Sequence, residues 1–428
     1  MNSIFWFRRD LRLKDNVGLV KALEGKYKVI PLFIFDTSTL DELPRNDARV
    51  SFIHSELKKL DQELQKFGSS LLIRYGDPVK IWGEMINEYN LKEVYFNKDY
   101  EPYAIDRDIK IRALLESKNV IVQSFKDQVI FEEDEVVKSD GSCYTVFTPY
   151  KNRWLEYFKE NPLPVNSEPK LANLESLSFN SPALKEIGFE PSSIFVKPFV
   201  LDHLENYTAL RNLPALNGTS NLSVHLRFGT VSIREIVLKV YLKYPTFLNE
   251  LIWREFFMQI LFHYPEVVHQ NFRRKYDGIE WRNDEKDFER WCKGETGYPM
   301  VDAGMRELNQ TGYMHNRVRM IAASFLCKHL LVDWRWGEAY FAKKLLDYEL
   351  SSNNGNWQWA AGTGCDAAPY FRIFNPAEQQ KKFDKDFTYV KRWIPELNSF
   401  NYPEPMVDHK FARDRALSVY KKGIINGD

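Results

Sequence analysis

The chain has 428 residues, more than one ordinary hydrophobic core holds, so two or three domains are expected. Hydrophobic residues make up 44% and charged residues 28%, which excludes a disordered chain, and the formal net charge is zero. The apolar runs, such as residues 29–35, are far shorter than the roughly 18 residues of a membrane-spanning helix. The N-terminal sequence is not typical of a secretory signal.

The first 126 residues alternate between short apolar strands and helical stretches, which predicts a parallel sheet covered by helices. Strands are predicted at 4–7, 29–35, 71–74, 93–97 and 120–125, and helices at 48–67 and 104–116. No G-x-G-x-x-G follows the first strand, so no dinucleotide is placed in this Rossmann-like α/β domain. Residues 127–195, with scattered prolines and little periodicity, are predicted to be an interdomain linker, and residues 196–428 an all-helical domain.

Two residue types limit the possible chemistry. The cysteines lack C-x-x-C spacing, which argues against a zinc site or a disulfide framework, and we expect no metal and a reducing cytoplasmic compartment. Eight of the 11 tryptophans lie after residue 250. They indicate either a tryptophan-rich helical core or a protein that uses stacking and electron chemistry.

Four local patterns admit both a structural and a functional interpretation. Residues 218–223, GTSNLS, are typical of a capped helix start or of a phosphate-binding loop. Glu250, Trp253 and Arg254 share one helix face, as in a surface ion pair or a base-binding pocket. The helix from residue 316 carries Asn, Arg and Met on one arc, so it is half-exposed or lines a polar cavity. Residues 353–359 are an Asn-rich helix start or an uncharged hydrogen-bonding set beside a cofactor.

Three longer strings point to one family. They are FRRDLR at 7–12, TGYPMVDAGMR at 296–306 and NRVRMIAASFLCKHLLVDW at 316–334. With them the chain resembles the photolyase/cryptochrome flavoproteins, and within these the class I cyclobutane-dimer photolyases of bacteria. The resemblance covers nearly the whole chain and is densest between residues 219 and 383. It implies light-dependent repair of cyclobutane pyrimidine dimers in DNA by electron transfer from photoexcited reduced FAD, which is held in the helical domain.

The resemblance also implies residue roles. FAD contacts are implied at Tyr207, Thr219, Ser220, Leu222, Ser223, Arg254, Arg319, Asp347, Glu349 and Asn353. Arg319 and Asp347 are implied as an ion pair beside the isoalloxazine ring, and Asn353 as the residue facing flavin N5. A relay that carries electrons to FAD is implied at Trp281, Trp334 and Trp357. The pocket for the dimer is implied at Glu250, Trp253, Asn316, Met320 and Trp359, and contacts to DNA phosphates at Arg211, Arg317 and Arg372.

Some positions depart from the family pattern. Glu349 stands where close relatives usually have Asp, and Tyr103 and Ala104 stand where a folate antenna pattern has Asn and Glu. A second antenna chromophore is therefore open between a deazaflavin, a flavin and none. The alternative function is a cryptochrome-type blue-light photoreceptor, although Asn353 stands where plant cryptochromes carry Asp. A (6-4) photolyase is disfavoured because Asn316 and Met320 occupy the places of its histidine pair.

We expect UV-damaged DNA as the partner, in a monomeric enzyme associated with the nucleoid of the cytoplasm. No membrane and no obligate protein partner are expected.

Overall fold

The computed structural model describes residues 1–163 and 169–427, and the chain divides into two compact units. Unit 1 comprises Met1–Ser142, Asn152–Phe199 and Asn221–Glu255, and unit 2 comprises Cys143–Lys151, Val200–Ser220 and Phe256–Asp428. Each unit is thus built from three separate chain segments. The sequence-based bounds 1–126, 127–195 and 196–428 stay a prediction.

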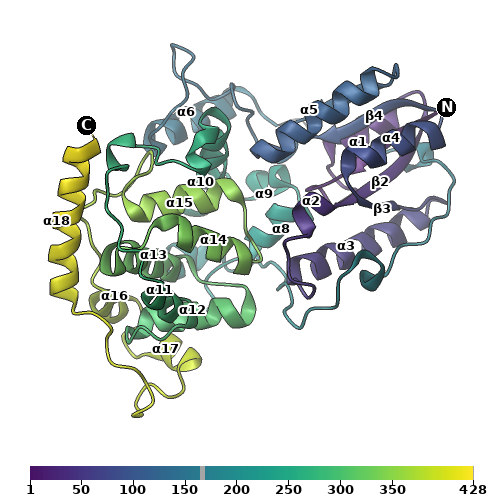
Figure 1. Cartoon of the computed structure of the whole chain (residues 1–428). Coiled ribbons are helices and arrows are strands. Elements are labelled where there is room, and N and C mark those ends of the chain that lie inside the picture. Colours follow the sequence, from purple (N-terminus) through teal and green to yellow (C-terminus); the bar gives the residue numbers. More distant parts are fainter. Residues whose placement is uncertain (164–168, 428) are drawn as a thin grey trace. The chain divides into compact units, whose positions relative to one another are not determined.

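The core of unit 1 is a five-stranded parallel sheet in the order β3-β2-β1-β4-β5 (Figure 1). The strands are β1 (Asn2–Phe7), β2 (Lys28–Asp36), β3 (Leu72–Gly76), β4 (Leu91–Asn97) and β5 (Ile121–Phe125). In the central strand, Ile4 lies opposite Ile30 of β2 and Val94 of β4, and all three side chains are fully buried. Burial on both faces explains why these strands are almost continuously apolar, and it confirms the predicted α/β fold.

Helices cover this sheet and extend unit 1 (Figure 1). Those of the sheet region are α1 (Val17–Glu24), α2 (Thr37–Leu40), α3 (Ala48–Gln65), α4 (Pro78–Glu88) and α5 (Pro102–Glu116). Those later in the chain are α8 (Leu222–Phe228) and α9 (Ile233–Val240). The capping aspartates Asp47 and Asp77 accept backbone hydrogen bonds at the starts of α3 and α4, which fixes where these helices begin.

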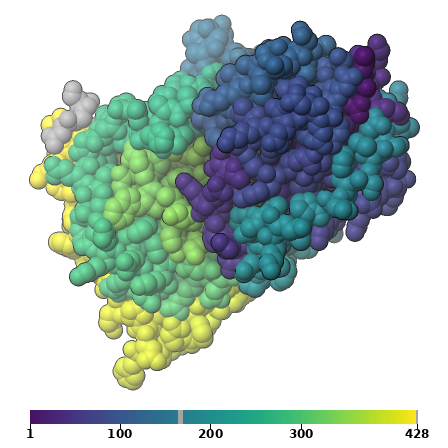
Figure 2. Space-filling view, turned by 45° about the vertical axis from the view of Figure 1, so that its right-hand side comes forward, coloured from purple at the N-terminus to yellow at the C-terminus, as the bar shows by residue number. Residues whose placement is uncertain are grey.

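The predicted linker contains a helix that the sequence analysis missed, α6 (Phe147–Glu160). Tyr150, Trp154 and Phe158 follow one another at four-residue spacing and are all buried, so helical periodicity was present in the sequence. The linker residues that follow, in teal, lie on the surface of unit 1 in Figure 2. Residues 164–168 of the linker lie outside the described residues.

Unit 2 is helical and has its own core. Its larger helices are α11 (Glu285–Lys293), α12 (Pro299–Thr311), α13 (Asn316–Ser324), the π-helix η6 (Phe325–Leu330), α14 (Trp334–Lys344), α15 (Leu350–Ala361), α16 (Pro376–Phe383), α17 (Thr388–Trp393) and α18 (His409–Gly427). The short ones are α7 (Tyr207–Leu210), η3 (Leu204–Asn206), η4 (Pro265–Val268) and η5 (Arg274–Tyr276), while η1 (Leu171–Asn173) and η2 (Leu184–Ile187) belong to unit 1. Divisions between the units fall within α6 and within α10 (Pro245–His263). This confirms the predicted helical C-terminal part, in which α15 contacts both α13 and α14.

Among the described residues, the longest helices are too polar to cross a lipid bilayer.

A buried ionic network ties the segments of unit 1 together. Asp127 is 2% exposed and accepts hydrogen bonds from Arg12 at 2.8 Å and from Arg234 of α9 at 2.7 Å. Arg234 also pairs with Asp15 at 3.0 Å. Although burial opposes it, Arg12 and Arg234 hold the pKa of Asp127 below its usual value. The network joins the segment after β1, the segment after β5 and α9.

We predict that Asp127→Ala destabilises unit 1 by about 3–5 kcal/mol, because two buried guanidinium groups lose a shared counter-ion. Urea unfolding followed by circular dichroism measures the loss. The control is Lys14→Ala, which removes the solvent-exposed Lys14–Glu235 pair and costs less than about 1 kcal/mol. Equal effects of the two substitutions would contradict the structural role of Asp127.

Candidate functional site

Arg319 and Asp347 form an ion pair in unit 2. Two of their oxygen–nitrogen distances are 3.0 and 3.1 Å, and Arg319 Nε also donates to the Met314 carbonyl at 2.8 Å. The Asp347 side chain is 8% exposed and the Arg319 side chain 27%. The N-cap His315 accepts the backbone N–H of Arg317 and so fixes the start of α13, which carries Arg319. The structure therefore brings this predicted pair together.

Asn353, in the first turns of α15, is held in one orientation. Its Nδ2 donates to Glu338 Oε1 at 2.7 Å and to the Glu338 carbonyl at 3.1 Å. Because an amide nitrogen has two donor hydrogens, both are used by Glu338, and the acceptor Oδ1 faces away from that residue. Burial raises the pKa of Glu338, and the hydrogen bond from Asn353 opposes this. The sequence analysis missed Glu338, which fixes the orientation of the amide.

Two buried polar atoms near these residues have no hydrogen-bond partner among the described residues. They are Ser351 Oγ in α15 and His315 Nε2 at the start of α13. Burial and the neighbouring Arg319 lower the pKa of His315 to about 4, so its imidazole is neutral at pH 7. Buried polar atoms are normally satisfied, so these two are available to hydrogen-bond a water molecule or a ligand. The buried Glu349 begins α15 and accepts from Ser352 Oγ at 3.3 Å.

The predicted phosphate loop, residues 218–223, contains the point at which the chain passes from unit 2 to unit 1. In unit 2, Tyr207 is buried beneath the guanidinium of Arg211, the Thr219 carbonyl accepts from His203 Nε2 at 3.1 Å, and Ser220 is buried. In unit 1, Leu222 and Ser223 begin α8 after Asn221, whose φ is 54°. Leu222 is buried and Ser223 is exposed. Phosphate binding by these residues stays a prediction.

The three predicted relay tryptophans belong to the aromatic interior of unit 2. Trp357 and Trp334 are 2% and 1% exposed members of one core cluster, against which the half-buried Trp281 packs. Trp334 Nε1 donates to Asn271 Oδ1 at 2.9 Å. On its other side Trp281 meets Tyr420 edge-on, with ring centroids 5.8 Å apart. Two indoles are thus shielded from water, and one reaches the surface.

The predicted dimer-pocket residues are divided between the units. Glu250 and Trp253 lie half-buried on α10 in unit 1, where the neighbouring Arg254 donates to the Gln128 carbonyl at 2.8 Å. In unit 2, Asn316 is exposed and Met320 half-buried on α13, and Trp359 of α15 packs partly buried against the core.

The three predicted phosphate-binding arginines are close to one another in unit 2. Arg317 donates to Asn212 Oδ1 at 2.7 Å and lies over the ring of Phe383 at 4.5 Å. Burial and the neighbouring cations Arg211 and Arg372 lower the pKa of Arg317. Arg317 thus lies close to two further cations, and such a cluster suits a polyanion.

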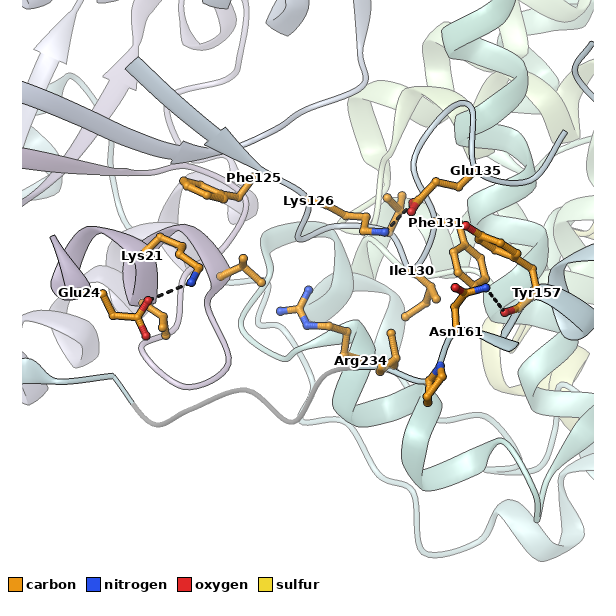
Figure 3. A pocket seen from close by; sticks show the side chains of 15 residues that line it. Lys21, Glu24, Phe125, Lys126, Ile130, Phe131, Glu135, Tyr157, Asn161 and Arg234 are labelled. Atoms are coloured by element: carbon orange, nitrogen blue, oxygen red, sulfur yellow. Dashed lines mark hydrogen bonds and ion pairs between the residues drawn. The ribbon is translucent and has the colours of Figure 1, made fainter. Parts of the chain in front are cut away.

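Unit 1 contains a pocket of about 610 Å³ that the sequence analysis did not predict (Figure 3). Its walls come from α1, from residues 125–126, 129–131 and 135, from the C-terminal end of α6 with the residues up to Leu163, and from Arg234. Its lysines and glutamates form the Lys21–Glu24 and Lys126–Glu135 pairs, and Arg234 pairs with the aspartates described above. The predicted site residues lie elsewhere. Among the described residues, no group of three or more acidic, His or Cys side chains could hold a metal ion.

Comparison with known proteins identifies the family. A family model described as "DNA photolyase" matches residues 3–170, and one described as "FAD binding domain of DNA photolyase" matches residues 247–401. The chain is 35% identical to a deoxyribodipyrimidine photo-lyase of Synechococcus sp., covering 98% of this chain and 96% of that one. The chain belongs to the DNA photolyase family.

Two solved photolyase structures are similar over nearly the full length. One is a bacterial class III photolyase from Agrobacterium tumefaciens, with a TM-score of 0.88 and 36% identity over 99% of this chain and 97% of that one. The other is an archaeal photolyase from Sulfolobus tokodaii with two FAD molecules, with a TM-score of 0.82 and 37% identity over 99% and 100%.

The cofactor of a photolyase is FAD, and the residues around Arg319 fit it. The ion pair, the fixed Asn353 acceptor and the unpartnered Ser351 hydroxyl supply a cation, acceptors and a donor within unit 2. Such a mixed set suits a ring system with both donor and acceptor atoms. Tyr103, at the position that departs from the folate pattern, donates to Asp36 at 2.7 Å. A second antenna chromophore stays a prediction without assigned residues.

We predict that Gly337→Ala disturbs the buried tryptophans of this photolyase. A Cβ at residue 337 of α14 would lie 2.1 Å from Cη2 of Trp357, so the indole must move. We expect a loss of about 1–3 kcal/mol in the free energy of unfolding, as in other overpacked cores. The control is Gly83→Ala in α4, where no atom lies within 4 Å and helix propensity favours alanine by about 1 kcal/mol. An unchanged stability and tryptophan fluorescence of Gly337→Ala would contradict the tight packing.

Proposed function

We propose that this chain is a deoxyribodipyrimidine photo-lyase, which uses light and FAD to split cyclobutane pyrimidine dimers in DNA. The observation that carries the proposal is the Arg319–Asp347 pair together with the oriented, uncharged Asn353 in a chain of the photolyase family. FAD, when bound, supplies a light-driven electron to the dimer. The roles of individual residues below are part of the proposal.

The cofactor is held by charge and by hydrogen bonds. Arg319 and Asp347 lie beside the isoalloxazine ring, and Asn353 would offer its amide oxygen to N5 because Glu338 occupies both amide hydrogens. A carboxylate at position 353 would repel an anionic ring, whereas the neutral amide does not. Arg254 and Glu349 complete the ring contacts, and the loop residues hold the phosphates and ribose. These are Tyr207, Thr219, Ser220, Leu222 and Ser223.

The dimer is bound outside the base stack. Extrusion of a base costs a few kcal/mol and is easiest for a damaged base, which gives part of the selectivity. Trp253 and Trp359 pack against the extruded bases, and Glu250 accepts or shares a hydrogen bond at the thymine edge. Asn316 and Met320 complete the pocket. The photolyase thereby excludes water from the lesion and keeps it at the distance that electron transfer needs.

The surrounding DNA is held by its backbone. Arg211, Arg317 and Arg372 contact the phosphates that flank the lesion, and such contacts position the enzyme without reading sequence. This suits an enzyme that must act wherever damage occurs. The partner is UV-damaged DNA in the cytoplasm at the nucleoid, bound by one copy of the chain without a second protein.

Electrons reach the cofactor through tryptophans. Trp281 lies nearest to solvent, and Trp334 and Trp357 are buried in the same core. Indoles are readily oxidised, so in this order they would carry an electron from an external thiol, which is the reductant, toward bound FAD.

The proposal is tested by repair. Irradiation of the purified protein with a dimer-bearing oligothymidylate should restore absorbance at the thymine maximum, and a dark sample should not change.

Glu250→Ala should lower the repair yield while FAD stays bound. The control Glu266→Ala, at an exposed position, should keep the wild-type repair yield. Wild-type protein that binds FAD without restoring absorbance would reject repair and favour the cryptochrome-type photoreceptor.

We further predict that Trp281→Phe slows photoreduction of bound FAD at least about tenfold in blue light with a thiol, because phenylalanine is much harder to oxidise than indole. The measurement is the loss of oxidised-flavin absorbance with time. Trp393→Phe, at another half-buried tryptophan packed on the same core, is the matched control and should photoreduce normally. Repair by chemically pre-reduced Trp281→Phe should be normal. Unchanged photoreduction would remove Trp281 from the relay.

A further inference from the structure

Glu255 of α10 is a buried carboxylate with three hydrogen-bond donors. It is 2% exposed and accepts from the backbone N–H groups of Ile130 at 2.6 Å and Phe131 at 3.2 Å. Its third donor is the indole Nε1 of Trp154 in α6, at 2.7 Å. All these residues belong to unit 1. One side chain of α10 is therefore hydrogen-bonded to both the segment after β5 and α6.

The segment that Glu255 grips is itself firmly held. It begins at Asp127, which is bound by Arg12 and Arg234, and the Gln128 carbonyl accepts from Arg254 of α10. Ile130 and Phe131 also line the pocket of unit 1 (Figure 3). The Phe131 ring meets Trp154 edge-on, with ring centroids 5.3 Å apart. Segment 127–131 is thus a firmly held attachment point for α10 within unit 1.

When the Glu255 side chain is held in place, the directions in which the nearby side chains of α10 point are also set. Successive residues of an α-helix are rotated by about 100° and displaced by about 1.5 Å, so the angular positions of Glu250 and Trp253 follow from that of Glu255. We propose that Glu255 is the positioning residue of the dimer pocket, which aims Glu250 and Trp253 by anchoring α10 to segment 127–131 and Trp154. This inference rests on the proposed function of those two residues.

A carboxylate is the side chain that the donors require. Glutamine has the same shape but only one acceptor oxygen, and its amide group would point an N–H at an N–H of the segment. Hydrogen bonds to a charged acceptor contribute more than neutral ones. Burial raises the pKa of Glu255 to about 7, and the hydrogen bonds from Ile130, Trp154 and Phe131, together with Arg254, oppose this.

The test compares Glu255→Gln and Trp154→Phe with the wild-type holoenzyme. The quantity measured is the ratio of affinities for a dimer-bearing and an undamaged oligothymidylate, with FAD content and the free energy of unfolding determined alongside. We expect each variant to lower this ratio, Glu255→Gln by about tenfold, because a buried backbone N–H loses its acceptor. Glu156→Gln, which alters an exposed ion pair on α6, is the matched control and should keep the wild-type ratio. A loss of stability alone lowers both affinities and leaves their ratio unchanged.

The double variant Trp154→Phe/Glu255→Gln decides whether the two residues act together. The double variant should lower the ratio by less than the product of the two single effects, since Trp154 and Glu255 are in direct contact and act through one anchor. An unchanged ratio in folded Glu255→Gln, or multiplicative effects, would overturn the positioning role. If Glu255→Gln does not fold, an unchanged ratio in Trp154→Phe overturns it. Wild-type protein that shows no preference for the dimer would instead reject the proposed function of the pocket.

Discussion

The whole of unit 1 depends on one buried carboxylate shared by two arginines. Asp127, together with Asp15, neutralises Arg12 and Arg234, so three chain segments meet where neither arginine could be buried alone. The segment that starts at Asp127 then receives Arg254 and Glu255 from α10. A continuous series of polar contacts therefore runs from the family motif after β1 to the helix that carries the proposed dimer-binding side chains.

Much of the fold was predictable because its signals are local. Parallel strands buried on both faces must be apolar throughout, so each strand was found within about two residues of its observed bounds. The helix α6 was missed, because the prolines after it suggested a linker, although Trp154 and Phe158 already followed helical spacing. Periodicity was a better guide there than composition.

The candidate site was predictable only in part, and the reason is distance along the chain. Arg319 and Asp347 are 28 residues apart, and no local pattern indicates that they pair; their roles came from resemblance. Glu338 and Glu255 were missed since an isolated glutamate on a helix is normally solvent-exposed. Their importance comes from partners 15 and 125 residues away, which only the folded chain brings to them.

The discontinuous make-up of unit 1 has a consequence during translation. Arg234 is synthesised 107 residues after Asp127, and Glu255 is the last residue of the unit. A nascent chain that has only reached the end of β5 contains every strand of the sheet but neither the second arginine nor the anchor of segment 127–131. The sheet can form early on the ribosome. Its buried ion pairs and the contacts of Glu255 are complete only once α9 and the first half of α10 have left the exit tunnel.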